Sequence, residues 1–160
     1  MSEVTENGYK EALNAALRYI TGADHTEYET RQKLLSKEYT SEVIDDVIEY
    51  LKQNSFINDK RYAAYYIVCY KDRRSALRIE TDLKRKGIDE SVISECMEEA
   101  DMDSSEAVFK ALKKQLQKRK TTDVESLNYE DLSKIYAALS RQGYSPEEIR
   151  NAIKNFTDDI

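Results

Sequence analysis

The chain has 160 residues, of which 35% are charged and 40% hydrophobic, with one Pro, four Gly and no Trp. So few turn-forming residues argue against a β-sandwich or β-barrel, which needs a turn roughly every 8–12 residues. No stretch approaches the roughly 18 apolar residues of a membrane span, and the acidic, polar start is not a secretory signal. Two cysteines make no disulfide framework, so the composition predicts a soluble, cytoplasmic, helical protein.

The first 56 residues read as three short helices. Apolar residues spaced i, i+3, i+4 and i+7 indicate the first helix, and they are Leu13, Ala16, Leu17 and Ile20. Residues 26–37 form the second predicted helix, and Thr40 or Ser41 is placed to cap a third. The inward-facing residues of these two helices are predicted to be Thr30, Leu34, Tyr39, Val43, Ile44, Val47, Ile48 and Leu51.

The pattern recurs 49 residues later, where Leu83–Ile93 can be laid over Leu34–Ile44. At this spacing Cys96 takes the place of Val47, so we predict it to be an apolar core residue. The residues that take the places of the first stripe, and are therefore also predicted to pack inside, are Tyr62, Tyr65, Tyr66 and Cys69.

A third copy follows after 56 more residues, at 139–149. Its Ser145 and Glu148 have the spacing of a capping box, with Pro at the first helical position between them. Gly87 and Gly143 stand just past the second helix of their copies, where a left-handed residue is favoured. Glu38 holds this place in the first copy, so we expect that turn to be strained or built differently.

Three copies of one pattern predict a repeat protein. A unit of about 50 residues can bury only a modest core, and such units gain stability by stacking on their neighbours. The predicted fold is therefore all-α, with three tandem three-helix bundles that form an elongated, curved molecule. The predicted repeats are residues 9–56, 57–101 and 104–158.

The net charge of −6 hides two basic blocks. Residues 60–86 hold nine Lys and Arg against three acids, and residues 110–120 hold six and no acid. Solvation of exposed helix faces is the simpler reading. However, both blocks nearly lack the acidic i, i+4 partners of a purely structural surface, which favours a salt-sensitive polyanion-binding face. Its predicted residues are Arg61, Arg73, Arg74, Arg78, Lys84, Arg85, Lys86, Lys113, Lys114 and Lys118, with Arg74, Arg78 and Arg85 sharing one helix face.

Motifs for catalysis are missing from the sequence. His25 is the only histidine and lies in a polar turn, and no Cys/His group has metal-ligand spacing. There is no glycine-rich phosphate loop and no nucleophile elbow. We therefore predict no catalytic residues, no metal, no cofactor and no enzymatic activity.

Four segments of the chain resemble the RecX family of regulatory proteins. They are Tyr28–Tyr39, Val43–Leu51, Phe56–Ala63 and Arg78–Ile88, the third being similar to the family's "aspartate, basic, aromatic, alanine" signature. The resemblance covers residues 10–100 closely and 104–157 by pattern. The chain departs from the family at Glu38, where Lys-Gly-Tyr is usual, and at 72–75, where a glycine-containing turn is usual.

The resemblance implies a cytoplasmic bacterial modulator that lies in the groove of the RecA filament on single-stranded DNA. Our first hypothesis is therefore a non-enzymatic monomer that binds this filament and inhibits recombinase and ATPase activity in DNA repair and the SOS response. A weak, salt-dependent contact with the DNA of the filament belongs to it. The alternative is a helix-turn-helix transcriptional regulator, although the third helices are Glu-rich. A scaffold for an unrelated protein partner also stays open.

Overall fold

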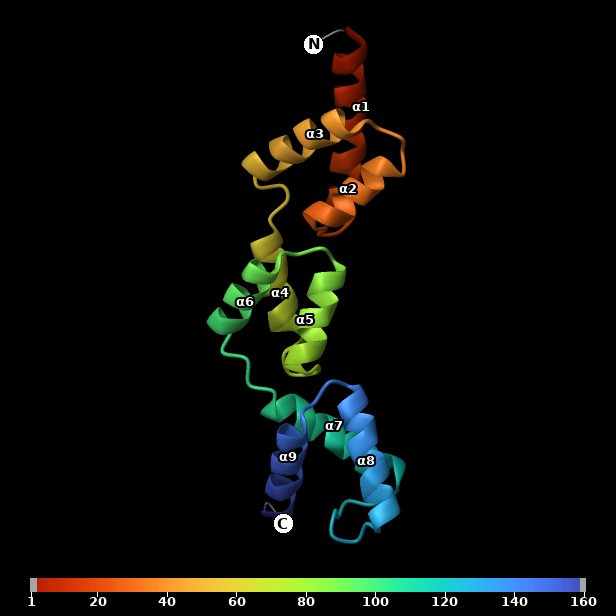
Figure 1. The fold of residues 1–160 in the computed structure, drawn as a ribbon, viewed down its shortest axis with the longest axis vertical. Coiled ribbons are helices and arrows are strands. Elements are labelled where there is room, and N and C mark those ends of the chain that lie inside the picture. The colour runs from red at the N-terminus through yellow and green to blue at the C-terminus, as the bar shows by residue number, and fades with distance from the viewer. Residues whose placement is uncertain (1–2, 159–160) are drawn as a thin grey trace. The chain divides into compact units, whose positions relative to one another are not determined.

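The computed structural model describes residues 3–158, and these form nine helices without a strand (Figure 1). In chain order the helices are α1 (Glu3–Gly22), α2 (Glu27–Leu35), α3 (Ser41–Gln53), α4 (Asp59–Tyr70), α5 (Ala76–Arg85), α6 (Glu90–Glu99), α7 (Ser105–Lys118), α8 (Tyr129–Arg141) and α9 (Pro146–Asp158). The predicted all-α fold class is confirmed. None of these helices combines the length and the apolar character that crossing a membrane requires.

The chain divides into two compact units. Unit 1 extends up to Tyr65 and takes in Leu83–Cys96, whereas unit 2 contains Tyr66–Asp82 and the chain from Met97 onward. The division passes through α4, α5 and α6. The repeat boundaries expected from the sequence therefore stay a prediction.

In unit 1, α1, α2 and α3 pack against one another in pairs. The buried side of α1 consists of Ala12 and Ala16, whose small side chains allow the apolar side of α3 to come close. Every residue predicted for that side of α3 is buried, and Leu34 of α2 is completely so. Leu13, Leu17, Ile20 and Tyr39 are half-buried at the edge of the same core.

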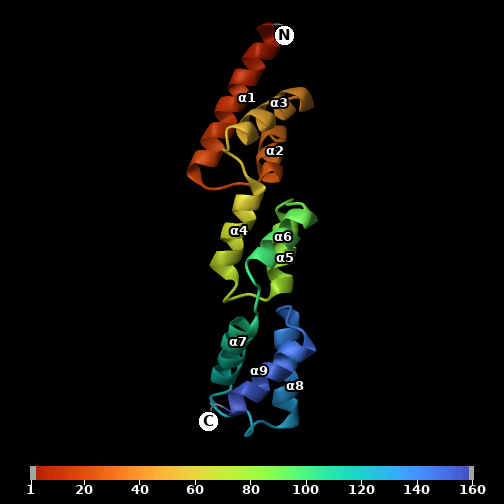
Figure 2. The ribbon, with the colours of Figure 1, turned by 90° about the vertical axis from the view of Figure 1, so that its left-hand side faces the viewer.

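In unit 2, α7, α8 and α9 form a second core, drawn in teal and blue in Figure 2. Each helix contributes completely or almost completely buried aliphatic side chains, which are Leu112, Leu116, Ile135, Leu139 and Ile149. Phe109 of α7 and Phe156 of α9 meet at its border, with ring centroids 5.2 Å apart. This core holds α7, which carries most of the second basic block, against α8 and α9.

The helix caps follow the sequence signals. Thr26 and Glu29 form a capping box at α2, and Thr40 caps α3 by accepting from the Val43 amide. At α9, the Ser145 amide donates to Glu148 at 2.7 Å, and the Glu148 amide donates to the Ser145 hydroxyl at 3.2 Å. The predicted capping box of the third copy is confirmed.

The predicted inner side of α4 is wrong. Ala63 and Ile67 are buried, whereas Tyr65 is 67% exposed, Cys69 is exposed, and Tyr62 and Tyr66 are only half-buried. Ala63 and Ile67 follow Ala12 and Ala16 by 51 residues rather than 49. The reason is that α4 ends three residues after Ile67, whereas α1 continues for six residues after Ala16, and the connection that follows α4 is only one residue longer. Cys96, which lies after that connection, is buried as predicted.

The turns after α2, α5 and α8 each contain a residue with a left-handed φ. Gly87 and Gly143 have φ of 74° and 90°, and Glu38 has φ of 62°. Left-handed backbone costs a non-glycine residue about 1–2 kcal/mol, so the first of the two expectations for Glu38, a strained turn, is confirmed.

Candidate nucleic-acid interface

Asp82 organises the first basic block within unit 2. It lies on α5, is almost fully buried, and receives hydrogen bonds from Arg74 at 2.6 Å and Arg78 at 3.2 Å. The Tyr66 hydroxyl is 3.3 Å from the same carboxylate and 2.7 Å from Arg74. Two guanidinium groups thus share one carboxylate, which offsets only part of their charge.

Arg74 is held from a second side by aromatic rings. Its guanidinium carbon lies 4.1 Å from the centroid of the Tyr70 ring, a cation–π distance, and the Tyr66 and Tyr70 rings are 4.5 Å apart. Burial, together with the charge of Asp82, raises the pKa of Tyr66, which therefore stays neutral. Arg74 is accordingly part of the internal structure of unit 2.

Two adjoining hollows of unit 2 are lined by cationic side chains, and we call them together the basic groove. The larger hollow, about 590 Å³, lies along α7, and the smaller, about 240 Å³, lies by Tyr144; they share Arg73 and Gln142. The cationic residues that line them are Arg73, Arg74, Arg78, Lys110, Lys113, Lys114 and Arg141. Burial raises the pKa of Tyr144 to about 12, so its phenol adds no negative charge there.

Most of the charge in the basic groove is not neutralised. Lys110 pairs with Glu106 at 2.6 Å, and Asp82 forms ion pairs with both Arg74 and Arg78. No acid among the described residues forms an ion pair with the other four cations, which are Arg73, Lys113, Lys114 and Arg141. Among the described residues, Asp72 is the only acid that lines either hollow. An open, cationic groove of this kind suits the phosphates of a polyanion.

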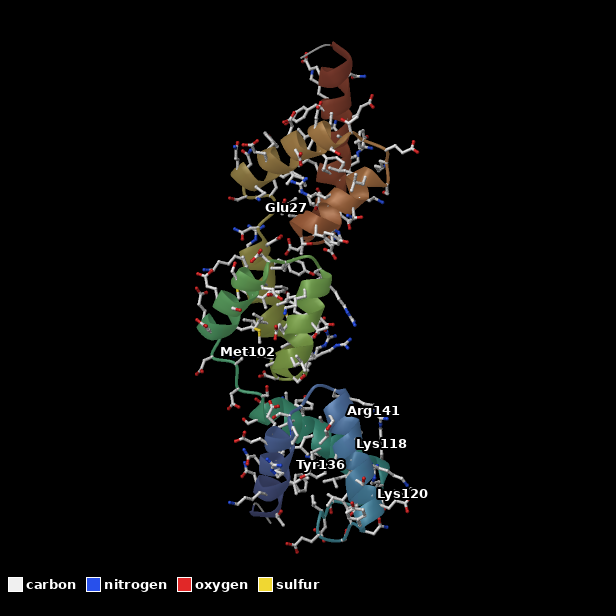
Figure 3. All side chains as sticks on the ribbon, viewed as in Figure 1. Glu27, Met102, Lys118, Lys120, Tyr136 and Arg141 are labelled. Carbon is white, nitrogen blue, oxygen red and sulfur yellow. The ribbon has the colours of Figure 1, made fainter. Side chains whose placement is uncertain are left out.

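Local sequence explains how these cations reach the groove. Buried residues of α7 alternate with exposed ones at helical spacing, which leaves Lys110, Lys113 and Lys114 on the solvent side. Arg141, labelled in Figure 3, is the last residue of α8, where a cation also interacts favourably with the helix dipole. The described residues contain no group of His, Cys, Asp and Glu side chains that could hold a metal ion.

Five of the ten residues predicted from sequence line the basic groove, and they are Arg73, Arg74, Arg78, Lys113 and Lys114. Lys118, also labelled in Figure 3, ends α7 outside both hollows. Sequence reasoning missed the contribution of Lys110 and Arg141. The sequence carried no signal for Arg141, because the end of α8 meets the start of α5 through the hydrogen bond from Ser75 to the Gln142 carbonyl, which joins residues 67 apart.

The remaining predicted residues, Arg61, Lys84, Arg85 and Lys86, belong to unit 1. Arg61 donates to the Ser55 carbonyl at 3.2 Å, and Lys84 pairs with Glu90 at 2.7 Å. Arg85 is exposed in the last turn of α5.

Lys86 is held inside unit 1. It pairs with Glu29 at 2.8 Å and lies 5.2 Å from the centroid of the Tyr62 ring. Burial alone would lower the pKa of Lys86, but hydrogen bonds with Glu29 and Tyr62 outweigh it and raise the pKa.

Some cations of the two blocks do have acidic partners, although the sequence pattern showed few at i, i+4 spacing. Arg78–Asp82 and Lys110–Glu106 are i, i+4 ion pairs within the blocks or at their border. Lys60 pairs with Glu95, and Arg119 lies 3.6 Å from Asp131. Glu95 and Asp131 are distant in sequence from Lys60 and Arg119, so helix spacing did not indicate these two pairs.

Comparison with known proteins gives a consistent result. Residues 12–51 match the family model described as "RecX, first three-helix domain". A protein named "Regulatory protein RecX" from Clostridium tetani is 33% identical over 152 residues, which cover 92% of this chain and 68% of that protein. Its namesake from Clostridium acetobutylicum is 32% identical, with 94% and 71% covered.

A more distant relative and a solved structure extend the likeness. "Regulatory protein RecX" from Yersinia enterocolitica is 27% identical, and the match covers 91% of this chain and 98% of that protein. The crystal structure of RecX from Lactobacillus salivarius has a TM-score of 0.82 at 24% identity, and the match covers 97% of this chain and 99% of that one. The second comparison shows that the two chains share a fold.

Proposed function

Because the chain belongs to the RecX family of regulatory proteins, we propose that it regulates a RecA-type recombinase by binding the filament this enzyme forms on single-stranded DNA. In this proposal the chain catalyses no reaction, acts in the cytoplasm as a monomer, and inhibits strand exchange and ATP hydrolysis. The three helical repeats at 9–56, 57–101 and 104–158 would each supply weak contacts that add up to avidity.

The observation that supports the proposal is the set of unpaired cations in the basic groove. A filament that contains DNA is strongly anionic, and a groove lined by one sign of charge attracts and orients such a partner. Arg73, Lys113, Lys114 and Arg141 carry this role because no described acid neutralises them. Arg74 and Arg78 support the groove through Asp82.

Co-sedimentation with recombinase filaments on single-stranded DNA tests the proposal. The groove variant carries Arg73→Gln, Lys113→Gln, Lys114→Gln and Arg141→Gln. The control variant removes four exposed cations outside both hollows by Lys10→Gln, Lys134→Gln, Arg150→Gln and Lys154→Gln. We expect the groove variant alone to bind filaments more weakly, by tenfold or more. Each lost phosphate contact contributes on the order of 1 kcal/mol or less to this effect. Equal binding by both variants would remove the groove from the mechanism.

A gel shift separates this function from the alternative of a sequence-specific transcriptional regulator. None of the comparisons reported above supports that alternative. Weak, salt-labile binding to any DNA is expected under our proposal. Tight duplex binding that depends on sequence and survives moderate salt would favour the alternative.

A further inference from the structure

Unit 1 contains a separate cationic hollow of about 520 Å³ between α1 and α2. Its cationic residues are Arg18 from α1, and Lys33 and Lys37 from the end of α2 and the turn that follows. The other residues that line it are Glu11, Asn14, Ala15, Tyr19 and Tyr39. The hollow lies in a segment, residues 1–59, with twelve acids against six Lys and Arg, so net charge along the sequence conceals it.

Ion pairing divides those six cations into two groups of three. Lys10 pairs with Glu6, Arg31 with Glu27 and Asp45, and Lys52 with Glu27. Within the part of the chain that the structure describes, Arg18, Lys33 and Lys37 form no ion pair, and all three line the one hollow. A structural surface in so acidic a segment would distribute its unpaired cations or pair them.

Intramolecular roles account for only part of this arrangement. Lys33 is in the last turn of α2, where a cation is favoured by the helix dipole, and its Nζ lies 5.6 Å from the centroid of the Tyr19 ring. Arg18 lies on α1, away from any helix end, and is exposed. Glu11 is the only acid among the described residues that line the hollow, and its carboxylate lies 3.3 Å from the side-chain amide of Asn7. The hollow therefore keeps an excess of positive charge.

Aromatic rings give the hollow a second property. Tyr19 is half-buried and stacks on His25, with centroids 3.8 Å apart and planes 12° from parallel, so its ring is held in place. Tyr39 is half-buried on the core of unit 1. Grooves that combine cations with aromatic side chains are typical of single-stranded nucleic-acid binding, whereas an acidic peptide needs the cations alone.

We propose that this hollow is a second phosphodiester subsite, which binds a segment of single-stranded DNA through Arg18, Lys33 and Lys37 beside Tyr19 and Tyr39. The identity of the nucleic acid rests on the proposed function, which places single-stranded DNA in the partner. Two anion sites in one chain raise avidity for a long polyanion beyond the affinity of either.

The salt dependence of binding to a fluorescein-labelled oligothymidylate, measured with the full chain and no recombinase, tests the subsite. Single-stranded DNA contributes a slope of about −0.7 per phosphate contact to log K against log salt concentration. The variant Arg18→Gln, Lys33→Gln, Lys37→Gln should therefore have a slope shallower by about 2. Lys134→Gln, Arg150→Gln, Lys154→Gln removes the same charge elsewhere and should keep the wild-type slope.

Two further arms make the outcome decisive. Arg18→Lys, Lys33→Arg, Lys37→Arg preserves the charge and should restore the slope, which separates a binding role from damage to α1 or α2. An unchanged slope in the glutamine variant overturns the subsite, and so does loss of poly-glutamate binding with DNA binding intact, which would assign the hollow to an acidic protein segment. Because no recombinase is present, failure of recombinase inhibition would leave this result standing.

Discussion

The Ser75 hydroxyl donates a hydrogen bond to the backbone carbonyl of Gln142 at 2.8 Å, across 67 residues of sequence, and accepts one from the Arg78 amide at 3.2 Å. Thr26 does the same in unit 1. Its hydroxyl donates to the Lys86 carbonyl at 2.7 Å and accepts from the Glu29 amide at 3.2 Å. Each buried N-cap hydroxyl thus caps its own helix and binds the end of a later one. The spacings of 49 and 56 residues seen in the sequence repeat recur in these donors and acceptors.

The replacement Ser75→Ala tests this double role. It leaves the Gln142 carbonyl without this donor and the Arg78 amide without its cap, and we expect a loss of about 2 kcal/mol in the free energy of unfolding. Ser145→Ala is the matched control, because Ser145 is an exposed cap that loses only the capping bonds, worth about 1 kcal/mol. Urea unfolding measures both variants. Equal losses in the two variants would show that the bond to Gln142 contributes nothing.

Substitutions in the turns that follow α8 and α2 should change the free energy of unfolding in opposite directions. A Cβ at position 143 would lie 2.6 Å from the Ser75 Oγ, so Gly143→Ala should destabilise unit 2 through both the contact and the positive φ. Glu38 is exposed, and Glu38→Gly removes only the backbone strain. We expect Glu38→Gly to raise the free energy of unfolding by up to about 1 kcal/mol and to raise the midpoint of thermal unfolding. A lower midpoint for Glu38→Gly would contradict this explanation.

Stability in acid depends on the carboxylates of α2. Burial alone would raise the pKa of Glu29, but hydrogen bonds from Lys86 and the Thr26 amide outweigh it and lower the pKa below the ordinary value of 4.5. Burial would likewise raise the pKa of Glu27, but hydrogen bonds from Lys52 and Arg31 outweigh it and lower this pKa. A carboxyl whose pKa is lower in the folded chain stabilises the fold above its unfolded pKa, and this stability is lost as pH falls through the folded value.

We therefore expect the urea midpoint of the wild type to fall as pH drops below about 4.5. Glu29→Gln should be less stable at neutral pH and should depend less on pH in this acid range. Asp59 acts in the opposite sense, because burial raises its pKa and its protonation favours the folded chain. A Glu29→Gln variant with the full acid sensitivity of the wild type would refute the role of Glu29.

Arg73 and Arg74 are neighbours in sequence with different roles. Arg74→Gln removes the ion pair with Asp82 and the contact with the Tyr70 ring, and we expect a loss of about 1–3 kcal/mol in the free energy of unfolding. Arg73→Gln removes an exposed cation and should change stability by less than about 0.5 kcal/mol while it weakens polyanion binding. Urea unfolding and oligonucleotide binding, measured on both variants, separate the two effects. Equal stability of the two variants would contradict the structural role of Arg74.

Local pattern in the sequence predicted the helices well, because helical periodicity and caps depend on residues a few positions apart. The apolar side of α3 and the capping box at Ser145 are examples. The prediction for the inner side of α4 was wrong because α4 ends earlier than the matching helix α1, which shifts the buried positions of α4 by two residues.

The candidate site was predicted only in part, because its geometry depends on tertiary contacts. The sharing of Asp82 by two arginines follows from the turn before α5, and Arg141 enters the basic groove through the contact of Gly143 with Ser75. The hollow around Arg18 was missed altogether, since its cations come from two helices of an acidic segment.

The central claim is that the unpaired cations of the basic groove enable this chain to inhibit a RecA-type recombinase. Its most direct test is the rate of ATP hydrolysis by the host's recombinase on single-stranded DNA, titrated with wild type, groove variant and control variant at several salt concentrations. We predict inhibition by the wild type and the control variant that weakens as salt rises, and a groove variant that needs at least about tenfold more protein for the same inhibition. Identical titration curves for the groove variant and the wild type, or no inhibition by the wild type at any salt concentration, would contradict the claim.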